Sequence, residues 1–195
     1  GVGGVIVYML PEGTIAAGRA LSMRRRGGSI VRNLSEQYVR AHAEAILHVA
    51  HDVPGEYWQI EHFLLPLPEK WALSFCVVDE AAETVQGYVI ASRKDRHVQV
   101  HHFMGAAPYR GRGLGAVMVR EIERRAATAG VGAISLKVHR ATGRALRFYQ
   151  REGFEIVTAG VGRNGEYVRL EKMLTPTRGV AIHQPNYFPW AGYFY

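Results

Sequence analysis

At the centre of the sequence stands Pro108-Tyr109-Arg110-Gly111-Arg112-Gly113-Leu114-Gly115, a glycine-rich segment between a predicted strand and a predicted helix. Residues 97–104 before it favour a strand, and apolar residues at helical spacing follow it. Glycines allow positive φ angles and a close approach of the backbone to a ligand. Consecutive backbone N–H groups, together with the unpaired donors at the start of a helix, attract anions. We therefore predict a phosphate-binding turn here.

Other glycine-rich motifs fit this segment less well. It lacks the G-K-[ST] ending of a Walker loop. Gly111-x-Gly113-x-x-Ala116 matches the looser dinucleotide-binding fingerprint, but no acidic residue follows it at about 20 positions. Taken alone, the eight residues also fit a helix start whose glycines only allow tight packing.

Length and composition predict one globular domain of 195 residues with room for an appendage. A hydrophobic content of 48% and a charged content of 21% exclude a disordered chain. The net charge of +7 favours an acidic partner, either nucleic acid, anionic lipid or a multiply phosphorylated cofactor. No segment approaches the ~18 apolar residues of a membrane span, so we expect no membrane partner.

The single cysteine, Cys76, lies in the apolar run 71–78 and has no second cysteine to pair with. We interpret it as a buried structural thiol in a reducing compartment. Residues 1–10 are apolar but lack a preceding basic region, so they do not make a good signal peptide. We therefore expect a cytoplasmic protein.

The segments before the glycine-rich turn predict helices followed by a meander of strands. Residues 1–28 are not assignable, and we interpret Arg24-Arg25-Arg26 as part of a solvated arm because no aromatic residues interleave with it. The predicted elements are a strand at 29–32, helices at 35–54 and 56–65, and strands at 72–79, 85–92 and 97–104.

The segments after the turn predict a strand–helix–strand unit. The helix from Gly113 carries an apolar stripe, and Glu121 and Arg125 can pair on its other flank. Residues 133–138 then form a strand that we expect to run parallel to 97–104 after a right-handed crossover. Thr142 can cap a further helix, and residues 155–159 and 167–173 would form a closing hairpin.

Two motifs resemble signatures of the GNAT family of N-acetyltransferases. Arg110-x-x-Gly113-x-Gly115 is similar to its Q/R-x-x-G-x-G/A motif. Residues 138–154 are similar to V-x-x-x-N-x-x-A-x-x-F-Y-x-x-x-G-F, with Thr142 in place of the usual asparagine. The resemblance covers about residues 29–174. It implies the α/β GNAT fold, a mixed central sheet with an antiparallel N-terminal meander, an acetyl-CoA-binding strand–turn–helix and a C-terminal strand–helix–strand.

The resemblance implies transfer of an acetyl group from acetyl-CoA to a primary amine of a small molecule. Backbone N–H groups of the turn would hold the pyrophosphate, and the edge of the preceding strand would pair with the pantetheine arm. The expected cofactor-binding residues are Phe103, Met104, Gly105, Arg110, Gly111, Arg112, Gly113, Leu114, Gly115, Thr142 and Arg144. The family's L-x-V-x-P lead-in is replaced by Phe103, Gly105 and Ala107, which leaves the splay of this strand open.

The resemblance also implies catalytic roles for two residues. Tyr149 would be the general acid beside the CoA sulfur, although an aromatic ring packed in the core is the alternative. His101 would be the general base; the alternative is a histidine that is only hydrogen-bonded in the sheet or exposed to solvent. Because His101 and His102 are neighbours on a strand, we expect their side chains on opposite faces. Lesser candidates for the base are Glu61, His62 and His139.

Metal-ligand spacing is lacking in the sequence. His97 and His101 would lie about 13 Å apart on a strand, too far to share an ion. His48 and His51 could be neighbours on a helix, but no further ligand completes a set. We therefore predict no metal.

Residues 179–195 resemble the start of a WbqC-like protein, which typically begins V-A-I-H-Q-P-N-Y-L-P-W-L-G-Y-F. We expect an N-terminal arm at 1–28, the acetyltransferase domain at 29–174, and a linker with the truncated start of a covalently linked WbqC-like domain at 175–195. WbqC-like genes often accompany surface-polysaccharide biosynthesis, and this association favours an amino sugar or a related small amine as acceptor. The exposed aromatic residues would need cover, which allows a homodimer.

Three other functions stay open at this stage. The acceptor could be a protein or peptide amine, although the net charge of +7 disfavours a lysine-rich partner. The domain could instead bind acyl-CoA without catalysis and regulate the attached WbqC-like domain. Nucleic-acid binding through the arginines would give a steep salt dependence, and it is the function we expect least.

Overall fold

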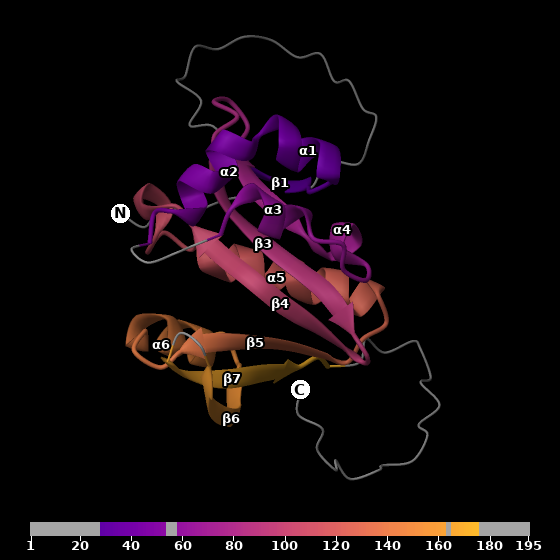
Figure 1. Cartoon of the computed structure of the whole chain (residues 1–195), viewed down its shortest axis with the longest axis vertical. Coiled ribbons are helices and arrows are strands. Elements are labelled where there is room, and N and C mark those ends of the chain that lie inside the picture. The colour runs from indigo at the N-terminus through magenta and orange to yellow at the C-terminus, as the bar shows by residue number, and fades with distance from the viewer. Residues whose placement is uncertain (1–27, 54–57, 163–164, 176–195) are drawn as a thin grey trace.

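The computed structural model describes residues 28–53, 58–162 and 165–175. These residues form a seven-stranded sheet in the order β1-β2-β3-β4-β5-β7-β6, with helices on both faces (Figure 1). The strands are β1 (Ser29–Asn33), β2 (Phe75–Asp79), β3 (Val85–Lys94), β4 (His97–Gly105), β5 (Ala133–His139), β6 (Glu155–Gly162) and β7 (Gly165–Met173). The helices are α1 (Glu36–Ala41), α2 (Ala43–Ala50), α3 (Ile60–Leu64), α4 (Lys70–Leu73), α5 (Leu114–Thr128) and α6 (Gly143–Arg151), with a 3-10 turn η1 (Ala107–Tyr109).

The order and direction of the strands confirm the predicted mixed sheet. Strands β1 to β4 form the antiparallel meander, and β4 and β5 run parallel after the crossover through α5. Strand β7 then pairs with both β5 and β6 in antiparallel fashion, which makes the predicted closing hairpin. The sheet is therefore antiparallel at both ends and parallel only in the middle of the described strands.

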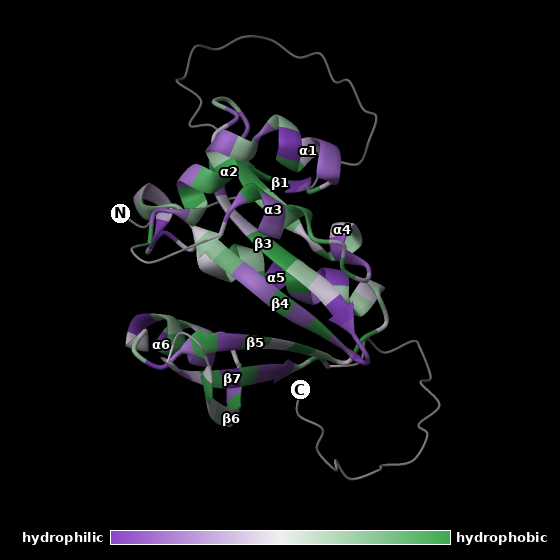
Figure 2. Cartoon of the chain, in the orientation of Figure 1, coloured by the Kyte–Doolittle hydropathy of each residue, from purple (hydrophilic) through white to green (hydrophobic). Residues whose placement is uncertain are grey.

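Hydrophobic side chains fill both faces of the sheet. Val89 and Ala91 of β3 pack on the same side as Met118 of α5, whereas Tyr88 and Ile90 pack on the side of α2 and α3. This alternation is what a strand buried on both faces requires. In Figure 2, β3 is green through its middle and purple at its arrowhead, so only the end of the strand leaves the core.

The predicted helix at 35–54 is wrong in one respect, since the structure has two helices there. His42 ends α1 with a φ of −118° and starts α2. Its ring Nδ1 lies 2.9 Å from the carbonyl oxygen of Tyr38, and the ring stacks on that tyrosine. The second predicted helix, 56–65, corresponds to the shorter α3, and residues 54–57 lie outside the described part of the chain.

The predicted strand at 72–79 begins only at Phe75, because α4 occupies the residues before it. Lys70 of α4 is buried, and its ammonium group donates to the carbonyl of Phe63 and, at 2.7 Å, to that of Leu65. These bonds join α4 to the end of α3. Burial lowers the pKa of Lys70 to about 8.

Other sequence predictions meet the structure in different ways. Cys76 is buried as predicted, and burial raises its pKa to about 11. None of the described helices is long and apolar enough to cross a membrane. Residues 1–27 and the WbqC-like segment 179–195 lie outside the described part of the chain.

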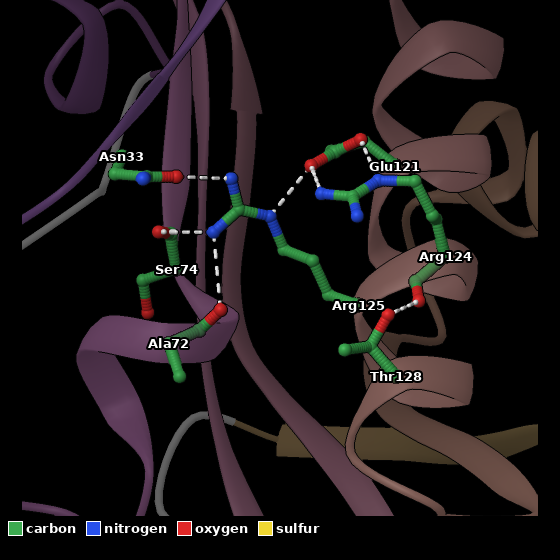
Figure 3. Close-up of polar contacts among 7 residues, drawn as sticks. All are labelled: Asn33, Ala72, Ser74, Glu121, Arg124, Arg125 and Thr128. Carbon is green, nitrogen blue, oxygen red and sulfur yellow. Dashed lines mark hydrogen bonds and ion pairs between the residues drawn. The ribbon is translucent and has the colours of Figure 1, made fainter. Parts of the chain in front are cut away.

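Helix α5 is fixed to the edge of the sheet by the hydrogen bonds of a buried arginine, Arg125 (Figure 3). Arg125 Nε lies 2.7 Å from a carboxylate oxygen of Glu121, which confirms the predicted pair, but both residues are buried rather than solvated. The same guanidinium donates to Asn33 Oδ1 at 2.6 Å and to the carbonyls of Ala72 and Ser74 at 3.1 and 3.2 Å. We call these contacts the Arg125 network.

The carboxylate of Glu121 is held in its charged form. Burial alone would raise its pKa, but hydrogen bonds and positive charge from Arg124 and Arg125 outweigh burial, so its pKa is lowered. The network thus joins α5 to β1 and to the junction between α4 and β2 through one desolvated cation, and each of its three nitrogens donates at least one hydrogen bond.

Replacing Arg125 with methionine should lower the free energy of unfolding by about 3 kcal/mol, because it leaves buried oxygens without donors. The matched control is Arg124→Met, whose side chain is 47% exposed and whose loss should cost under about 1 kcal/mol. Urea denaturation of both variants measures the difference. Equal losses in the two variants would contradict a special role for the buried arginine.

Candidate functional site

Strands β4 and β5 separate part of the way along their length. They pair only from His97–Gln99 of β4 to residues 133–135 of β5. Figure 1 shows them close together at the hairpin end of β4 and diverging toward α6. Beyond Gln99, the backbone of β4 that faces β5 has no strand partner, so its N–H and C=O groups can bind an extended ligand. We call this gap the β4–β5 opening. The sequence had left open whether β4 splays away from its neighbour.

A β-bulge lies where the opening begins. Ile90 of β3 pairs with His102, and the next residue, Ala91, pairs with Val100, which leaves His101 as an extra residue. A bulge of this kind bends and twists its own strand. The bend explains why β4 leaves β5 immediately after the last paired residues.

The bulge overturns the prediction that His101 and His102 point to opposite faces. His101 Nε2 lies 2.7 Å from Ser92 Oγ, and His102 Nδ1 lies 2.7 Å from the Tyr88 hydroxyl. Ser92 and Tyr88 are four positions apart on β3 and so share one face. Both histidines therefore lie on the face that carries α2 and α3, because the extra residue shifts the alternation by one.

The glycine-rich turn has the positive φ angles that its sequence predicted. Gly111 has a φ of 73° and Gly113 a φ of 87°. Asp52, just after α2, accepts hydrogen bonds from the Ala107 N–H and from Arg110 Nη2, the latter at 3.1 Å. Arg110 Nε also donates to the carbonyl of Gly105 at 2.8 Å. The side chain of Arg110 thus holds the turn in shape rather than extending toward a ligand.

The start of α5 lies directly against α6. Gly113 caps α5, and a Cβ atom on Gly115 would fall 2.7 Å from Cζ of Phe148. Only a residue without a side chain allows this approach. It brings the N–H groups of the first turn of α5, which have no acceptor within the helix, to the edge of the space beside α6.

A cleft of about 530 Å³ connects the turn, α6 and the β4–β5 opening. The predicted site residues that line it are Phe103, Gly105, Arg110, Gly111, Gly113, Leu114, Gly115, Thr142, Arg144 and Tyr149. His101, Met104 and Arg112 do not line it; the Met104 side chain packs on the opposite face of the sheet. Lining residues for which the sequence predicted no role include Val53, Tyr109, Phe148, Arg151 and Glu152.

Tyr149 has features of both predicted alternatives, an aromatic ring packed in the core and a residue with access to the cleft. Its ring packs at 5.6, 5.1 and 5.6 Å, centroid to centroid, against Phe103, Phe148 and Phe154. The residue also lines the cleft, and its hydroxyl makes no hydrogen bond to any residue that the structure describes. Burial raises the pKa of Tyr149, so its hydroxyl is protonated at neutral pH.

Two arginines of α6 supply positive charge to the cleft. Arg144 and Arg151, seven positions apart, both line it, and neither forms an ion pair with a described carboxylate. Arg147 between them does not line it. Thr142 stands at the N-cap of α6 as predicted, but its hydroxyl makes no capping bond; the residue lines the cleft.

His101 lies on the far side of the opening from the cleft. The residue is exposed, and partial desolvation of the ring, followed by the positive charges of Lys70 and Lys94, lowers its pKa. A histidine with a lowered pKa is neutral at pH 7 and can accept a proton. Within the described ranges, no three histidine, cysteine or acidic side chains gather as metal ligands would.

Comparisons with known proteins give the same fold. A profile described as the Acetyltransferase (GNAT) family matches residues 34–154. No curated protein matches the chain in sequence. An Escherichia coli N-acetyltransferase, whose name gives an alanine of a ribosomal protein as its target, is 14% identical with a TM-score of 0.64, over 79% of this chain and 99% of the other.

Two further solved structures are similar. Ard1 from Thermoplasma volcanium is 18% identical with a TM-score of 0.66, over 75% of this chain and 98% of the other. The NatC complex bound to Gag peptide and CoA is 18% identical with a TM-score of 0.64, over 75% of this chain and 99% of the matched one. At these identities the likeness establishes the fold alone.

Replacing Gly115 with valine should lower the free energy of unfolding by about 2 kcal/mol, because the added atoms overlap the Phe148 ring. The control is Gly132→Val, where a Cβ would meet no atom within 4 Å and where we expect a change of about 0.5 kcal/mol. Thermal and urea denaturation measure both. A neutral Gly115→Val variant would show that α5 and α6 are free to move apart.

Proposed function

The chain belongs to the acetyltransferase (GNAT) family, and on that premise we propose that it transfers an acetyl group from acetyl-CoA to the primary amine of a small molecule. The observation that carries this proposal is the cleft, which joins a helix N-terminus to an unpaired strand edge and to the Tyr149 hydroxyl. One continuous space thus offers a binding site for an anion, a free strand edge for an extended chain of amides, and a proton donor. These are the three requirements of a CoA thioester.

The groups that line the cleft suit the chemistry of CoA. The N–H groups of the turn and of the first residues of α5 would hold the pyrophosphate. The backbone of Phe103 and Met104 at the β4–β5 opening would pair with the amides of the pantetheine arm and supply an oxyanion donor. Thr142 lies beside the same space from the start of α6. The similar NatC complex described above has CoA bound.

Acetyl transfer needs a base on one side of the opening and an acid on the other. The ammonium form of the acceptor must lose a proton, which His101 would accept. The neutral amine nitrogen then attacks the thioester carbonyl, the C–S bond of the tetrahedral intermediate breaks, and Tyr149 gives its proton to the leaving thiolate. The proton that remains on the nitrogen is lost to solvent, which also returns a proton to the Tyr149 phenolate. Helices α5 and α6 cover the face of the sheet on which the cleft lies. The amine would therefore arrive from the opposite face, where His101 lies.

The class of acceptor has two candidates. An amino sugar or related small amine is favoured by the resemblance of residues 179–195 to a WbqC-like protein. A peptide or protein amine is the second candidate, because one of the similar enzymes is named for a ribosomal protein and another has a peptide bound. A regulatory domain that only binds acyl-CoA predicts binding without turnover, so measured thiol release would exclude it.

Replacing Tyr149 with phenylalanine should lower kcat about a hundredfold while the affinity for acetyl-CoA stays within about twofold. The hydroxyl has no described partner, so the fold should be unaffected. Tyr109→Phe is the control, since Tyr109 also lines the cleft. Release of free thiol from acetyl-CoA, with amino sugars and peptides as acceptors, measures kcat. An unchanged kcat would remove Tyr149 from the mechanism.

Replacing Arg151 or Arg144 with glutamine should weaken CoA binding about tenfold through loss of a charged contact to the ribose 3′-phosphate. Backbone groups of the turn would bind the pyrophosphate. The two arginines, which pair with no described carboxylate, would then bind the third phosphate. Arg147→Gln, outside the cleft, is the control. Calorimetric titration with CoA and 3′-dephospho-CoA measures this; the variants should discriminate less between the two than the unaltered protein does. Unchanged discrimination in both variants would contradict the assignment.

A further inference from the structure

Strand alternation defines the residues on the acceptor side of the opening. Along β5, Leu136 and Val138 belong to the core beneath α5 and α6, so Lys137 and His139 point to the opposite face. Both are exposed, and they lie across the β4–β5 opening from His101. An amine that approaches His101 therefore meets Lys137 as it enters.

Lys137 is held in a defined position. Its Nζ lies 4.7 Å from the ring centre of Tyr167 on β7. Tyr167 in turn lies over Gly160 of β6, where a Cβ atom would fall 2.7 Å from the tyrosine hydroxyl. A glycine at this position is what lets the ring lie across β6. Lys137, Tyr167 and Gly160 together hold the ammonium group of the lysine in place, and we call these three residues the Lys137 platform.

The charge of Lys137 is not neutralised by a described carboxylate. The acidic residues on the adjoining strand already have cationic partners, since Glu171 pairs with Arg169 at 2.9 Å and Glu166 with Arg140 at 3.8 Å. Across the opening, Asp52 is occupied by the turn. The lysines near His101, Lys70 and Lys94, add further positive charge.

We propose that the Lys137 platform binds an anionic group of the acceptor, a carboxylate or a phosphate, so that the substrate is an amine that also carries a negative charge. This inference rests on the proposed acetyl transfer. An acceptor with several positive charges would be repelled on entry. The same positive field favours the neutral form of the amine, which is the form that attacks.

Paired acceptors test the inference. Thiol release from acetyl-CoA is measured with glucosamine and glucosamine 6-phosphate, for phosphate, and with glycinamide and glycine, for carboxylate. We expect kcat/KM for the anionic member of at least one pair to exceed that of its neutral partner about tenfold. Lys137→Gln should abolish this preference and Lys137→Arg should retain most of it.

Arg120→Gln is the charge-matched control, because Arg120 is exposed on α5, away from Lys137. It should leave the preference unchanged. A neutral acceptor used as well as its anionic partner in both pairs, or a preference that survives Lys137→Gln, would overturn the inference while leaving acetyl transfer intact. Acetyl-CoA binding without turnover of any of the four amines would instead contradict the proposed function, and with it this inference.

Discussion

One extra residue in β4 is the constraint on which the site depends. By inserting His101 opposite the step from Ile90 to Ala91, the bulge bends β4 away from β5 and leaves the β5-facing edge of β4 without a strand partner beyond Gln99. Unpaired main-chain groups inside a sheet are costly unless water or a ligand satisfies them. The cost is concentrated where a thioester arm would lie, so the same irregularity that weakens the sheet creates a place for an extended molecule.

The elements around the opening divide its two sides between two tasks. Helices α5 and α6 and the glycine-rich turn form a cleft that offers N–H groups, two arginines and the Tyr149 hydroxyl. The opposite face offers His101 and the Lys137 platform. Asp52 connects the sides, because it follows α2 in the chain yet accepts hydrogen bonds from the turn at Ala107 and Arg110. In the proposed function, cofactor and acceptor would thus approach one opening from opposite faces of the sheet.

The local features of the fold and the order of its strands could be predicted from the sequence, whereas the register of one strand pair and the partners of buried charged side chains could not. The turn and the parallel pair of strands follow from glycines, periodicity and the two family motifs. The bulge depends on the register between β3 and β4, which no spacing in β4 alone encodes, so the facing of His101 and His102 was predicted wrongly. Arg151 lies seven residues after Arg144, a spacing that places both on one face of a helix, but a role was predicted only for Arg144. The burial of Lys70 depends on carbonyls at the end of α3.

The Arg125 network also bears on how long the folded state lasts. Its contact to Asn33 joins residues 92 positions apart, so the chain must close a long loop before this bond can form. We expect such a contact to be absent from the folding transition state and present only in the native state. Its energy then slows unfolding rather than speeding folding. The buried arginine would in that case determine the lifetime of the native protein and its resistance to proteolysis more than the rate at which it folds.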